Sequence, residues 1–212
     1  MKYQAVIFDL DGVICHTDSY HYLAWKQIAD ENNIYFDEQI NNRLRGVSRE
    51  KSFEIILERS SREFAPEEKA GITNRKNEIY KELLKSMSPA DIEPEVITTL
   101  NTLKEAGVLL GIGSSSKNAR LILEKVGLEG FFDAISDGVG LRKSKPDPEV
   151  FIRCAKMLGV LPEHCLVVED AVAGVQAAKA AGMDCAAVSD AADSGIADYN
   201  LVRFSDLLDI AV

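Results

Sequence analysis

The sequence is short of positive charge. Its 212 residues hold 24 Lys and Arg against 34 Asp and Glu, which gives a formal net charge of -10. Nucleic acids and anionic membrane surfaces bind basic protein faces, because their phosphate groups repel an acidic one. We therefore expect neither nucleic acid nor a membrane as a partner.

Cysteines and long apolar runs are also scarce. The four cysteines, Cys15, Cys154, Cys165 and Cys185, stand far apart, without the C-x-x-C pair or the neighbouring His cluster typical of a zinc site. The apolar run before Asp9 is too short for a signal peptide or a membrane span. These absences predict a cytoplasmic protein with free thiols.

The rest of the composition is that of a soluble globular protein, with 46% hydrophobic and 27% charged residues. Short apolar runs typical of buried strands occur at residues 4–8, 108–113, 165–169 and 184–189. Each later run follows a helical pattern that ends at a glycine, namely Gly107, Gly159 or Gly182. This alternation predicts an α/β fold whose core is a doubly wound parallel sheet covered by helices on both faces.

Residues 15–90 interrupt that alternation with helical patterns only. The sequence therefore predicts an α/β core made of residues 1–14 and 91–212, with a helical cap of residues 15–90 inserted after the first strand. An insert at this position lies over the carboxyl ends of the strands, where open α/β sheets bind their ligands.

Two carboxylates follow the first predicted strand. Asp9 and Asp11 are two positions apart, so in an extended segment both can face one pocket. A calcium loop would need acidic or amide ligands where this chain has Val13 and Tyr20, which excludes that interpretation.

A second acidic pair, Glu169-Asp170, directly follows another apolar strand. Carboxylates gathered at one edge of a sheet repel one another unless a divalent cation joins them, and hard oxygen ligands favour magnesium. The alternative is that Asp170 only caps the helix that follows.

Two further segments have the chemistry of a phosphate site. Residues 114–118, SSSKN, stand between a predicted strand and a predicted helix, where backbone N–H groups and hydroxyls suit a phosphate oxygen. Lys145 precedes a proline in K-P-D-P, and this proline keeps the backbone of Lys145 out of the helical conformation. The ammonium is therefore presented from a rigid, non-helical segment. Taken singly, the first segment is equally typical of an ordinary helix cap with a solvated lysine, and the second of a turn.

The four segments DLDG, SSSKN, KPDP and ED occur in a fixed order. In this order and spacing the sequence resembles the haloacid dehalogenase superfamily of phosphotransferases over essentially the whole chain. The resemblance implies that Asp9 is the nucleophile that forms an aspartyl phosphate and that Asp11 is the general acid and base. It also implies that Ser114 and Lys145 bind the transferring phosphoryl group. The implied magnesium site consists of Asp9, the Asp11 backbone carbonyl and Asp170, with Glu169 in support.

The predicted cap carries its own candidates. Thr17, His21 and Trp25 recur at four-residue spacing, which predicts one helix face beginning beside Asp11. Trp25 alone is typical of core packing, whereas His21 suits a core or a functional position equally.

Residues 45–49, RGVSR, set Arg45 and Arg49 around a glycine. Guanidinium groups bind phosphate oxygens in pairs, so a second phosphate site is one interpretation and a solvated loop is the other. Lys76, between Arg75 and Asn77, is by itself typical of a solvent-facing basic turn.

The cap segments H-x-x-x-W, R-G-V-S-R-E-x-S, R-K-N-x-x-Y and S-P-A-D-I together resemble those of the β-phosphoglucomutases. That family interconverts β-glucose 1-phosphate and glucose 6-phosphate through β-glucose 1,6-bisphosphate. The resemblance implies a small phosphorylated sugar as substrate, Mg²⁺ as cofactor and glucose 1,6-bisphosphate as activating phosphoryl donor. It implies that Thr17 and His21 act beside the catalytic pair. The implied substrate contacts are Trp25, Arg45, Gly46, Val47, Arg49, Ser52, Lys76, Ser115, Ser116, Lys117 and Asn118.

Within this set the resemblance assigns finer roles. Arg49 with residues 116–118 would hold the phosphate that is not being transferred, and His21 with Lys76 would couple cap closure to the position of Asp11. Two departures stand out, because Cys15-His16 replaces an expected Thr-Asp and Arg45 replaces an expected Lys.

Two other functions remain as alternatives. A magnesium-dependent sugar-phosphate phosphatase of the same superfamily would carry the same core segments. A non-catalytic phospho-receiver module would also combine acidic pairs with a hydroxyl and a lysine, but it would lack a helical insert of this size. We expect a monomer.

Overall fold

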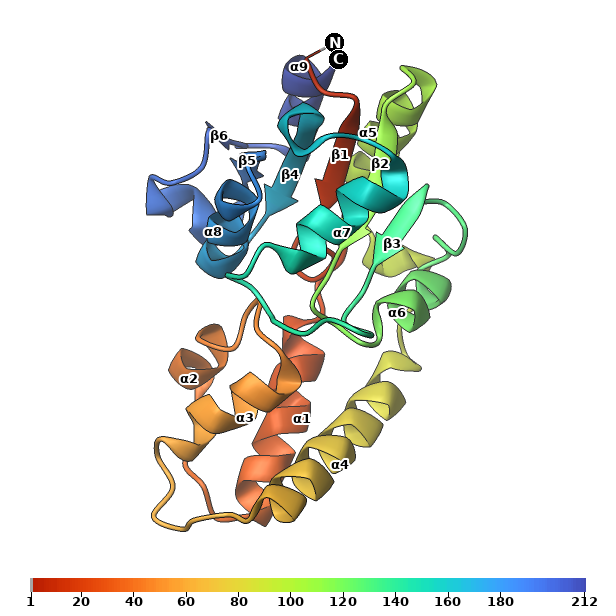
Figure 1. The fold of residues 1–212 in the computed structure, drawn as a ribbon. Helices are drawn as coiled ribbons and strands as arrows, with labels where there is room; N and C mark the ends of the chain where they lie inside the picture. The colour runs from red at the N-terminus through yellow and green to blue at the C-terminus, as the bar shows by residue number, and fades with distance from the viewer. Residues whose placement is uncertain (1) are drawn as a thin grey trace.

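A computed structural model describes residues 2–212, so Met1 of the predicted core lies outside the described residues. The strands form one parallel sheet in the order β3-β2-β1-β4-β5-β6 (Figure 1). Their bounds are β1 Ala5–Phe8, β2 Leu109–Gly113, β3 Ala134–Ser136, β4 Cys165–Glu169, β5 Asp184–Ala187 and β6 Tyr199–Asn200. The predicted parallel-sheet α/β fold is therefore confirmed.

The strand register brings the predicted site residues to one edge. Phe8, the last residue of β1, pairs with Ile112 of β2 and with Val168 of β4. The chain therefore leaves these three strands at the same level of the sheet. All four residues of β1 are fully buried, as expected of a central strand covered on both faces.

Helices cover both faces of the sheet and extend beyond its carboxyl edge. One apolar cluster joins the sheet to α7 and α8, and a second joins the opposite face to α5, α6 and α9. The bounds of these helices are α5 Pro94–Glu105, α6 Ala119–Lys125, α7 Glu149–Leu158, α8 Val172–Ala180 and α9 Leu207–Ala211. Short 3-10 helices occur at η1 Pro89–Asp91, η2 Pro162–His164, η3 Ser189–Ser194 and η4 Phe204–Asp206.

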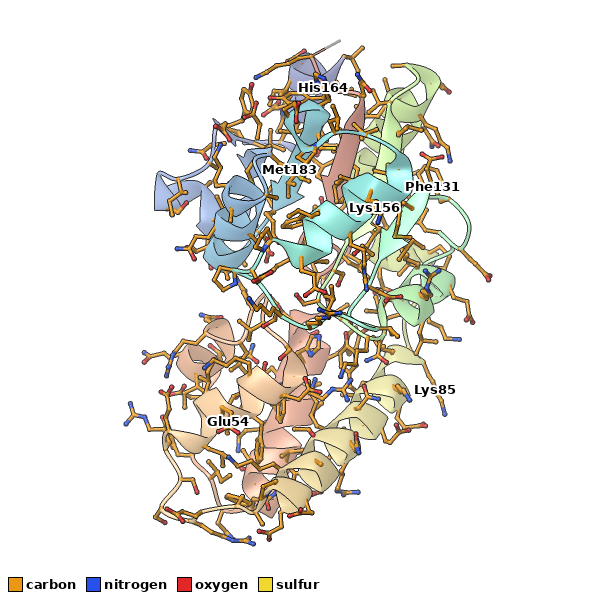
Figure 2. All side chains as sticks on the ribbon, viewed as in Figure 1. Glu54, Lys85, Phe131, Lys156, His164 and Met183 are labelled. Atoms are coloured by element: carbon orange, nitrogen blue, oxygen red, sulfur yellow. The ribbon has the colours of Figure 1, made fainter. Side chains whose placement is uncertain are left out.

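The helices between β1 and η1 lie together beyond the carboxyl edge of the sheet (Figure 1). They are α1 Asp18–Glu31, α2 Glu38–Asn42, α3 Arg49–Leu57 and α4 Pro66–Leu84. A separate apolar cluster, with Trp25 and Phe53 stacked at 5.9 Å between ring centroids, holds them together. In Figure 2 Glu54 marks this helical part, whereas His164 marks the opposite, amino-terminal end of the sheet. The separate cluster supports the predicted division into core and cap, which stays a prediction.

Two sequence expectations bear on the chain as a whole. The four cysteines are buried and unpaired in the described residues, as predicted. Among residues 2–212, no helix combines the length and the apolar character that crossing a membrane requires.

Candidate active site

A cavity of about 410 Å³ lies between the carboxyl edge of the sheet and the helices α1 to α4. Asp9 follows β1, Ser114 follows β2 and Asp170 follows β4, so all three reach this cavity from the same edge. Every predicted site residue lines it except Thr17, Lys145 and Glu169, which lie behind the lining. Residues that line it without having been predicted include Asp18, Asn41, Ser48, Glu50, Gly138, Leu141, Arg142 and Ser144.

Lys145 is the cation nearest to the predicted nucleophile. Its fully buried ammonium forms ion pairs with Asp9 and with Glu169. Burial alone would lower the pKa of Lys145, but the charges of Asp9 and Glu169 raise it above its ordinary value. Glu169 in turn accepts hydrogen bonds from the backbone N–H groups of Asp170 at 3.0 Å and Ala171 at 3.1 Å. Glu169 therefore holds Lys145 and does not face the cavity itself.

Asp11 has the environment of a proton donor and acceptor. Burial and the nearby charge of Asp9 raise the pKa of Asp11 to about 7, while a hydrogen bond from the Thr17 hydroxyl acts in the opposite direction. A carboxyl with a pKa near 7 can give and take a proton at neutral pH. Thr17 thus contributes through Asp11 and from outside the cavity.

The interpretation of Asp170 as a helix cap is wrong. Helix α8 begins at Val172 after Ala171, and its start has no side-chain cap. The Asp170 carboxylate is buried and accepts no hydrogen bond from residues 2–212. Burial, followed by the charges of Glu169 and Asp9, raises its pKa to about 9.

A divalent cation fits this carboxylate pair. Asp9 and Asp170 are hard oxygen donors at the cavity wall, and a cation beside them would relieve the repulsion that raises the pKa of Asp170. No group of three His, Cys, Asp or Glu side chains converges as a preformed metal site in residues 2–212. The donor set therefore suits an ion whose remaining ligands are backbone, water and phosphate oxygens.

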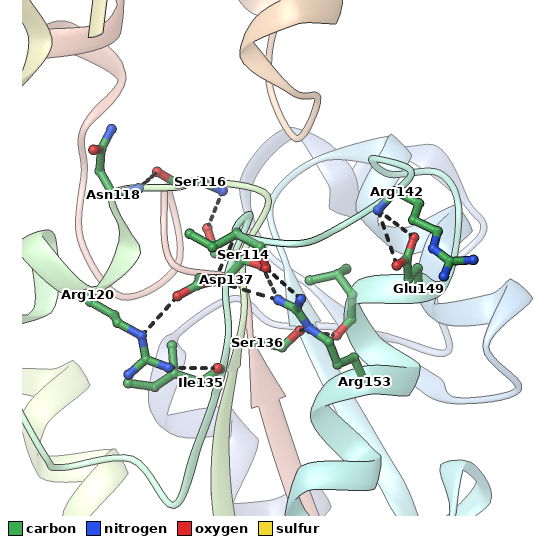
Figure 3. A network of polar contacts seen from close by, with 12 residues as sticks. Ser114, Ser116, Asn118, Arg120, Ile135, Ser136, Asp137, Arg142, Glu149 and Arg153 are labelled. Carbon is green, nitrogen blue, oxygen red and sulfur yellow. Dashed lines mark hydrogen bonds and ion pairs between the residues drawn. The ribbon is translucent and has the colours of Figure 1, made fainter. Parts of the chain in front are cut away.

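Residues 114–118 form a folded loop. The Ser114 hydroxyl accepts from the backbone N–H of Ser116 at 3.1 Å, and the Ser116 hydroxyl accepts from that of Asn118 at 3.2 Å (Figure 3). Asn118 precedes α6, whose start has no side-chain cap. The interpretation of this segment as an ordinary serine cap is therefore wrong, because the serines organise the loop itself.

A second loop that the sequence did not indicate supports the first. Gly138, just after β3, donates its N–H to the Ser116 carbonyl at 3.0 Å, and a Cβ at Gly138 would come within 2.3 Å of the Ser115 carbonyl oxygen. Arg120 binds the Asp137 carboxylate at 3.0 Å, and Arg153 binds the Ser136 hydroxyl at 2.9 Å (Figure 3). The Asp-Gly pair was the signal that could have predicted this loop.

The helical side of the cavity contains a buried cation. Lys76 on α4 is only 2% exposed, so the interpretation of its segment as a solvent-facing turn is wrong for this residue. Its Nζ lies 2.8 Å from Nδ1 of His21, whose ring stacks on Tyr80 with centroids 4.1 Å apart. Burial, then the charges of Lys76 and Arg49, lower the pKa of His21 well below its ordinary value. The lowered pKa favours the neutral form of His21, in which Nδ1 can accept a hydrogen bond from Lys76.

The loop between α2 and α3 faces the sheet edge. Arg49 lines the cavity without an ion pair to residues 2–212, and burial lowers its pKa. Arg45 instead forms ion pairs with Asp18 at 2.7 Å and Asp190 at 2.9 Å. The Ser52 hydroxyl donates to the carbonyl of Ser48 at 3.0 Å, within its own helix.

Gly46 and Val47 lie between the two arginines on the cavity wall. The carbonyl of Gly46 accepts a hydrogen bond from the Ser115 hydroxyl at 3.1 Å. Lys117 pairs with Glu50 at 2.9 Å, and the Asn118 amide donates to Asn77 at 2.9 Å. Three residues of the loop 114–118, which we call the phosphate loop, thus contact the helical part.

Known proteins give the family. The sequence-family model described as haloacid dehalogenase-like hydrolase matches residues 3–182 of this chain. The sequence is 43% identical over 206 residues to a β-phosphoglucomutase of Bacillus subtilis strain 168, covering 96% of this chain and 91% of that protein. It is 33% identical to the fructose-1-phosphate phosphatase YqaB of Escherichia coli K12, covering 86% of this chain and 95% of that protein.

A solved structure agrees with the sequence comparisons. The crystal structure of β-phosphoglucomutase from Clostridium difficile superposes with a TM-score of 0.92 at 36% identity, covering 97% of this chain and 93% of that one. The resemblance inferred from the four core segments is confirmed, and the chain belongs to the family of haloacid dehalogenase-like hydrolases.

Proposed function

We propose that the protein is a β-phosphoglucomutase, which interconverts β-D-glucose 1-phosphate and D-glucose 6-phosphate through β-glucose 1,6-bisphosphate. The observation that carries the proposal is one cavity with phosphoryl-transfer carboxylates at the sheet edge and, at the start of the facing helix α3, Arg49 without an ion pair to residues 2–212. A substrate that carries a phosphate at each end needs both features. The similarity to β-phosphoglucomutases over nearly the whole chain supports the same substrate.

Asp9 is the proposed nucleophile. One of its carboxylate oxygens bonds to a phosphorus of the bisphosphate while the bond from that phosphorus to the sugar oxygen breaks, and Asp11 gives that oxygen its proton, which leaves a sugar monophosphate. In the return step the free hydroxyl of a sugar monophosphate bonds to the phosphorus carried by Asp9 as the bond to Asp9 breaks, which forms the bisphosphate. Asp11 then takes the hydroxyl proton, so its pKa of about 7 suits both directions.

Lys145 and Ser114 are the proposed partners of the transferring phosphoryl oxygens. The ammonium of Lys145 is held against Asp9 by Glu169 and reduces the repulsion between the carboxylate and an incoming phosphate. Mg²⁺, held by Asp9, Asp170 and the Asp11 backbone carbonyl, would supply further positive charge at the transferring group.

Arg49 is the proposed anchor of the distal phosphate, together with residues 116–118. Its guanidinium lines the cavity with no carboxylate of residues 2–212 paired to it. Lys117 reaches the same region but pairs with Glu50, at 2.9 Å, so a bound phosphate would compete with that carboxylate. Closing the cap over a distal phosphate excludes water and orients the sugar hydroxyl.

His21 and Lys76 are the proposed link between the cap and Asp11. Thr17 at the start of α1 donates to Asp11, and one turn further along α1 His21 receives a hydrogen bond from Lys76 of α4. A shift of α4 relative to α1 would therefore move the Thr17 hydroxyl and with it the proton donor.

The competing function is a sugar-phosphate phosphatase, which the 33% identity to a fructose-1-phosphate phosphatase favours. The test supplies Mg²⁺, β-glucose 1-phosphate and a trace of glucose 1,6-bisphosphate as activator. Glucose 6-phosphate is followed by a coupled assay and inorganic phosphate in the same sample, with the α anomer as control. We expect glucose 6-phosphate from the β anomer only. Fast phosphate release with negligible glucose 6-phosphate would establish the phosphatase instead.

A further inference from the structure

Arg45 connects the helical part to the sheet domain. It lies on the loop between α2 and α3, and its guanidinium bonds Asp18 at the start of α1 and Asp190 of η3. The Arg45 side chain is 27% exposed, whereas that of Asp190 is 80% exposed. The Asp190 contact therefore lies at the rim of the active site and joins two elements 145 residues apart in sequence.

The same loop is fixed on its other side. The Gly46 carbonyl accepts the hydrogen bond from Ser115, and the Gly46 backbone lies so near α8 that a Cβ there would be 3.5 Å from that of Ala171. Gly46 has a φ of +73°, a conformation that glycine adopts without strain. Arg45 and Gly46 thus hold one short loop against the sheet domain from two directions.

A second hollow, of about 240 Å³, lies on the outer side of this loop. Arg45, Val47 and Asp170 line both this hollow and the main cavity. Arg45 and Val47 therefore form the wall that separates the outer hollow from the active site, and Asp190 borders the hollow. Loss of the wall would open a side path for water from this hollow, past Asp170, toward Asp9.

We propose that Arg45 is a positioning residue that, through its ion pair with Asp190, closes this side path and protects the aspartyl phosphate from water. The proposal rests on the proposed mutase function. In the side reaction a water oxygen bonds to phosphorus, the bond from phosphorus to Asp9 breaks, and the Asp9 carboxylate and inorganic phosphate are released. One water proton passes to Asp11 and the other stays on the phosphate. A mutase must keep this reaction slow while it waits for a sugar phosphate.

The test compares the wild type with Asp190→Asn, Asp190→Glu and Asp193→Asn. Asp193 lies on the same η3 helix, is exposed and makes no ion pair with residues 2–212, so its substitution removes an equal charge and leaves Arg45 untouched. The measured quantity is inorganic phosphate released per glucose 6-phosphate formed from β-glucose 1-phosphate. We expect this ratio to increase about fivefold in Asp190→Asn, which corresponds to the free energy that one exposed ion pair can contribute. Asp190→Glu and Asp193→Asn should match the wild type.

Salt gives a second readout, because it acts on the ion pair without a change in the chain. About 0.5 M NaCl screens an exposed pair, so the wild-type ratio should rise toward that of Asp190→Asn, whose own ratio should stay constant. An unchanged ratio in Asp190→Asn, or an equal increase in Asp193→Asn, would overturn the proposal.

Failure of the proposed function can be told apart from failure of this inference. If the wild type forms no glucose 6-phosphate, the phosphoenzyme is made with acetyl phosphate and its decay to inorganic phosphate is followed. Faster decay in Asp190→Asn than in the wild type and in Asp193→Asn would still assign the protective role to Arg45. Equal decay in all three would refute it.

Discussion

The ammonium of Lys76 lies 2.8 Å from Nδ1 of His21, and between α1 and α4 Lys76 is buried whereas His21 is half-buried. Aromatic rings surround the cation, with the Tyr80 centroid 4.5 Å and the Trp25 centroid 5.1 Å from Nζ. Burial, with the charge of Arg49 in the same direction, still lowers the pKa of Lys76 to about 7. The contacts therefore offset only part of the free energy that removing this cation from water costs.

Replacing Lys76 by Met should stabilise the protein and slow the enzyme. Lys76 has a pKa of about 7 in the folded state against 10.5 ordinarily, so the unfolded chain binds more protons between these values and wild-type stability rises with pH there. The variant lacks this dependence. We expect its free energy of unfolding to exceed that of the wild type by about 2 kcal/mol at pH 7, with the difference shrinking toward pH 10.

Urea denaturation between about pH 6.5 and 9.5 measures how the free energy of unfolding changes with pH in the wild type and in the variant. The control is Lys81→Met on the same helix, where the side chain is 40% exposed and pairs with Glu78, so its effect should stay within about 0.5 kcal/mol at every pH. A Lys76→Met variant that is less stable than the wild type at pH 7 would contradict the argument.

Arg49→Ala should weaken the binding of sugar phosphates but not that of small phosphoryl donors. If Arg49 holds the distal phosphate, the variant should raise KM for β-glucose 1-phosphate by about tenfold to a hundredfold, the range for a lost charged hydrogen bond. Acetyl phosphate has no second anchoring group, so its kinetics should change little. Arg75→Ala, which removes an exposed arginine paired with Glu31, is the matched control. Equal effects on both donors would show that Arg49 does not bind the distal phosphate.

Sequence patterns predicted the part of the site that depends on strand ends. Asp9, Ser114 and Glu169 each follow or end an apolar run of four or five residues, and parallel strands bring such positions to one edge. Both the fold class and the convergence of these residues could therefore be predicted. The structure extends this prediction by showing that Glu169 acts through Lys145 and lies outside the cavity lining.

Other parts could not be predicted because their signals are too short or depend on packing. Strand β3 has three residues and β6 has two, so neither shows a periodicity, and the Asp137-Gly138 loop after β3 was missed with them. Lys76 lies on a mostly polar helix, and only the packing of His21 and Tyr80 against it makes it buried. The contact between Arg45 and Asp190 joins the two parts of the fold, and no local sequence pattern indicates it.

Asp9→Asn and Asp11→Asn should both abolish turnover while leaving the fold intact, for different reasons. Asp9→Asn removes the nucleophile, so no phosphoenzyme should form from glucose 1,6-bisphosphate. Asp11→Asn removes only proton transfer, which contributes about a hundredfold to ten-thousandfold to a rate. That variant should therefore still be phosphorylated on Asp9 by acetyl phosphate, whose leaving group needs little protonation. Intact-mass measurement after acid quench distinguishes the two, and sugar turnover retained in either variant would refute its assigned role.

Two glycine substitutions should have opposite effects because their surroundings differ. At Gly138 a Cβ would lie 2.3 Å from the Ser115 carbonyl oxygen and 2.9 Å from the Lys117 nitrogen, so Gly138→Ala must displace the phosphate loop. At Gly71, inside α4, a Cβ would meet nothing within 4 Å. Alanine favours a helix interior over glycine by about 0.5 to 1 kcal/mol, so Gly71→Ala should raise stability by that amount with unchanged kinetics.

Gly138→Ala should instead raise KM for β-glucose 1-phosphate by about tenfold and lower kcat, because misplacement of positioned groups by about 1 Å costs rate heavily. Thermal unfolding and steady-state kinetics on both variants provide the comparison. Arg120 and Arg153 should still hold Asp137 in place. Expressed as free energies, the loss of activity should therefore exceed the loss of stability. Wild-type kinetics in Gly138→Ala would mean that the loop after β3 does not support the phosphate loop, and the contact of Gly138 with Ser116 would then be incidental to binding.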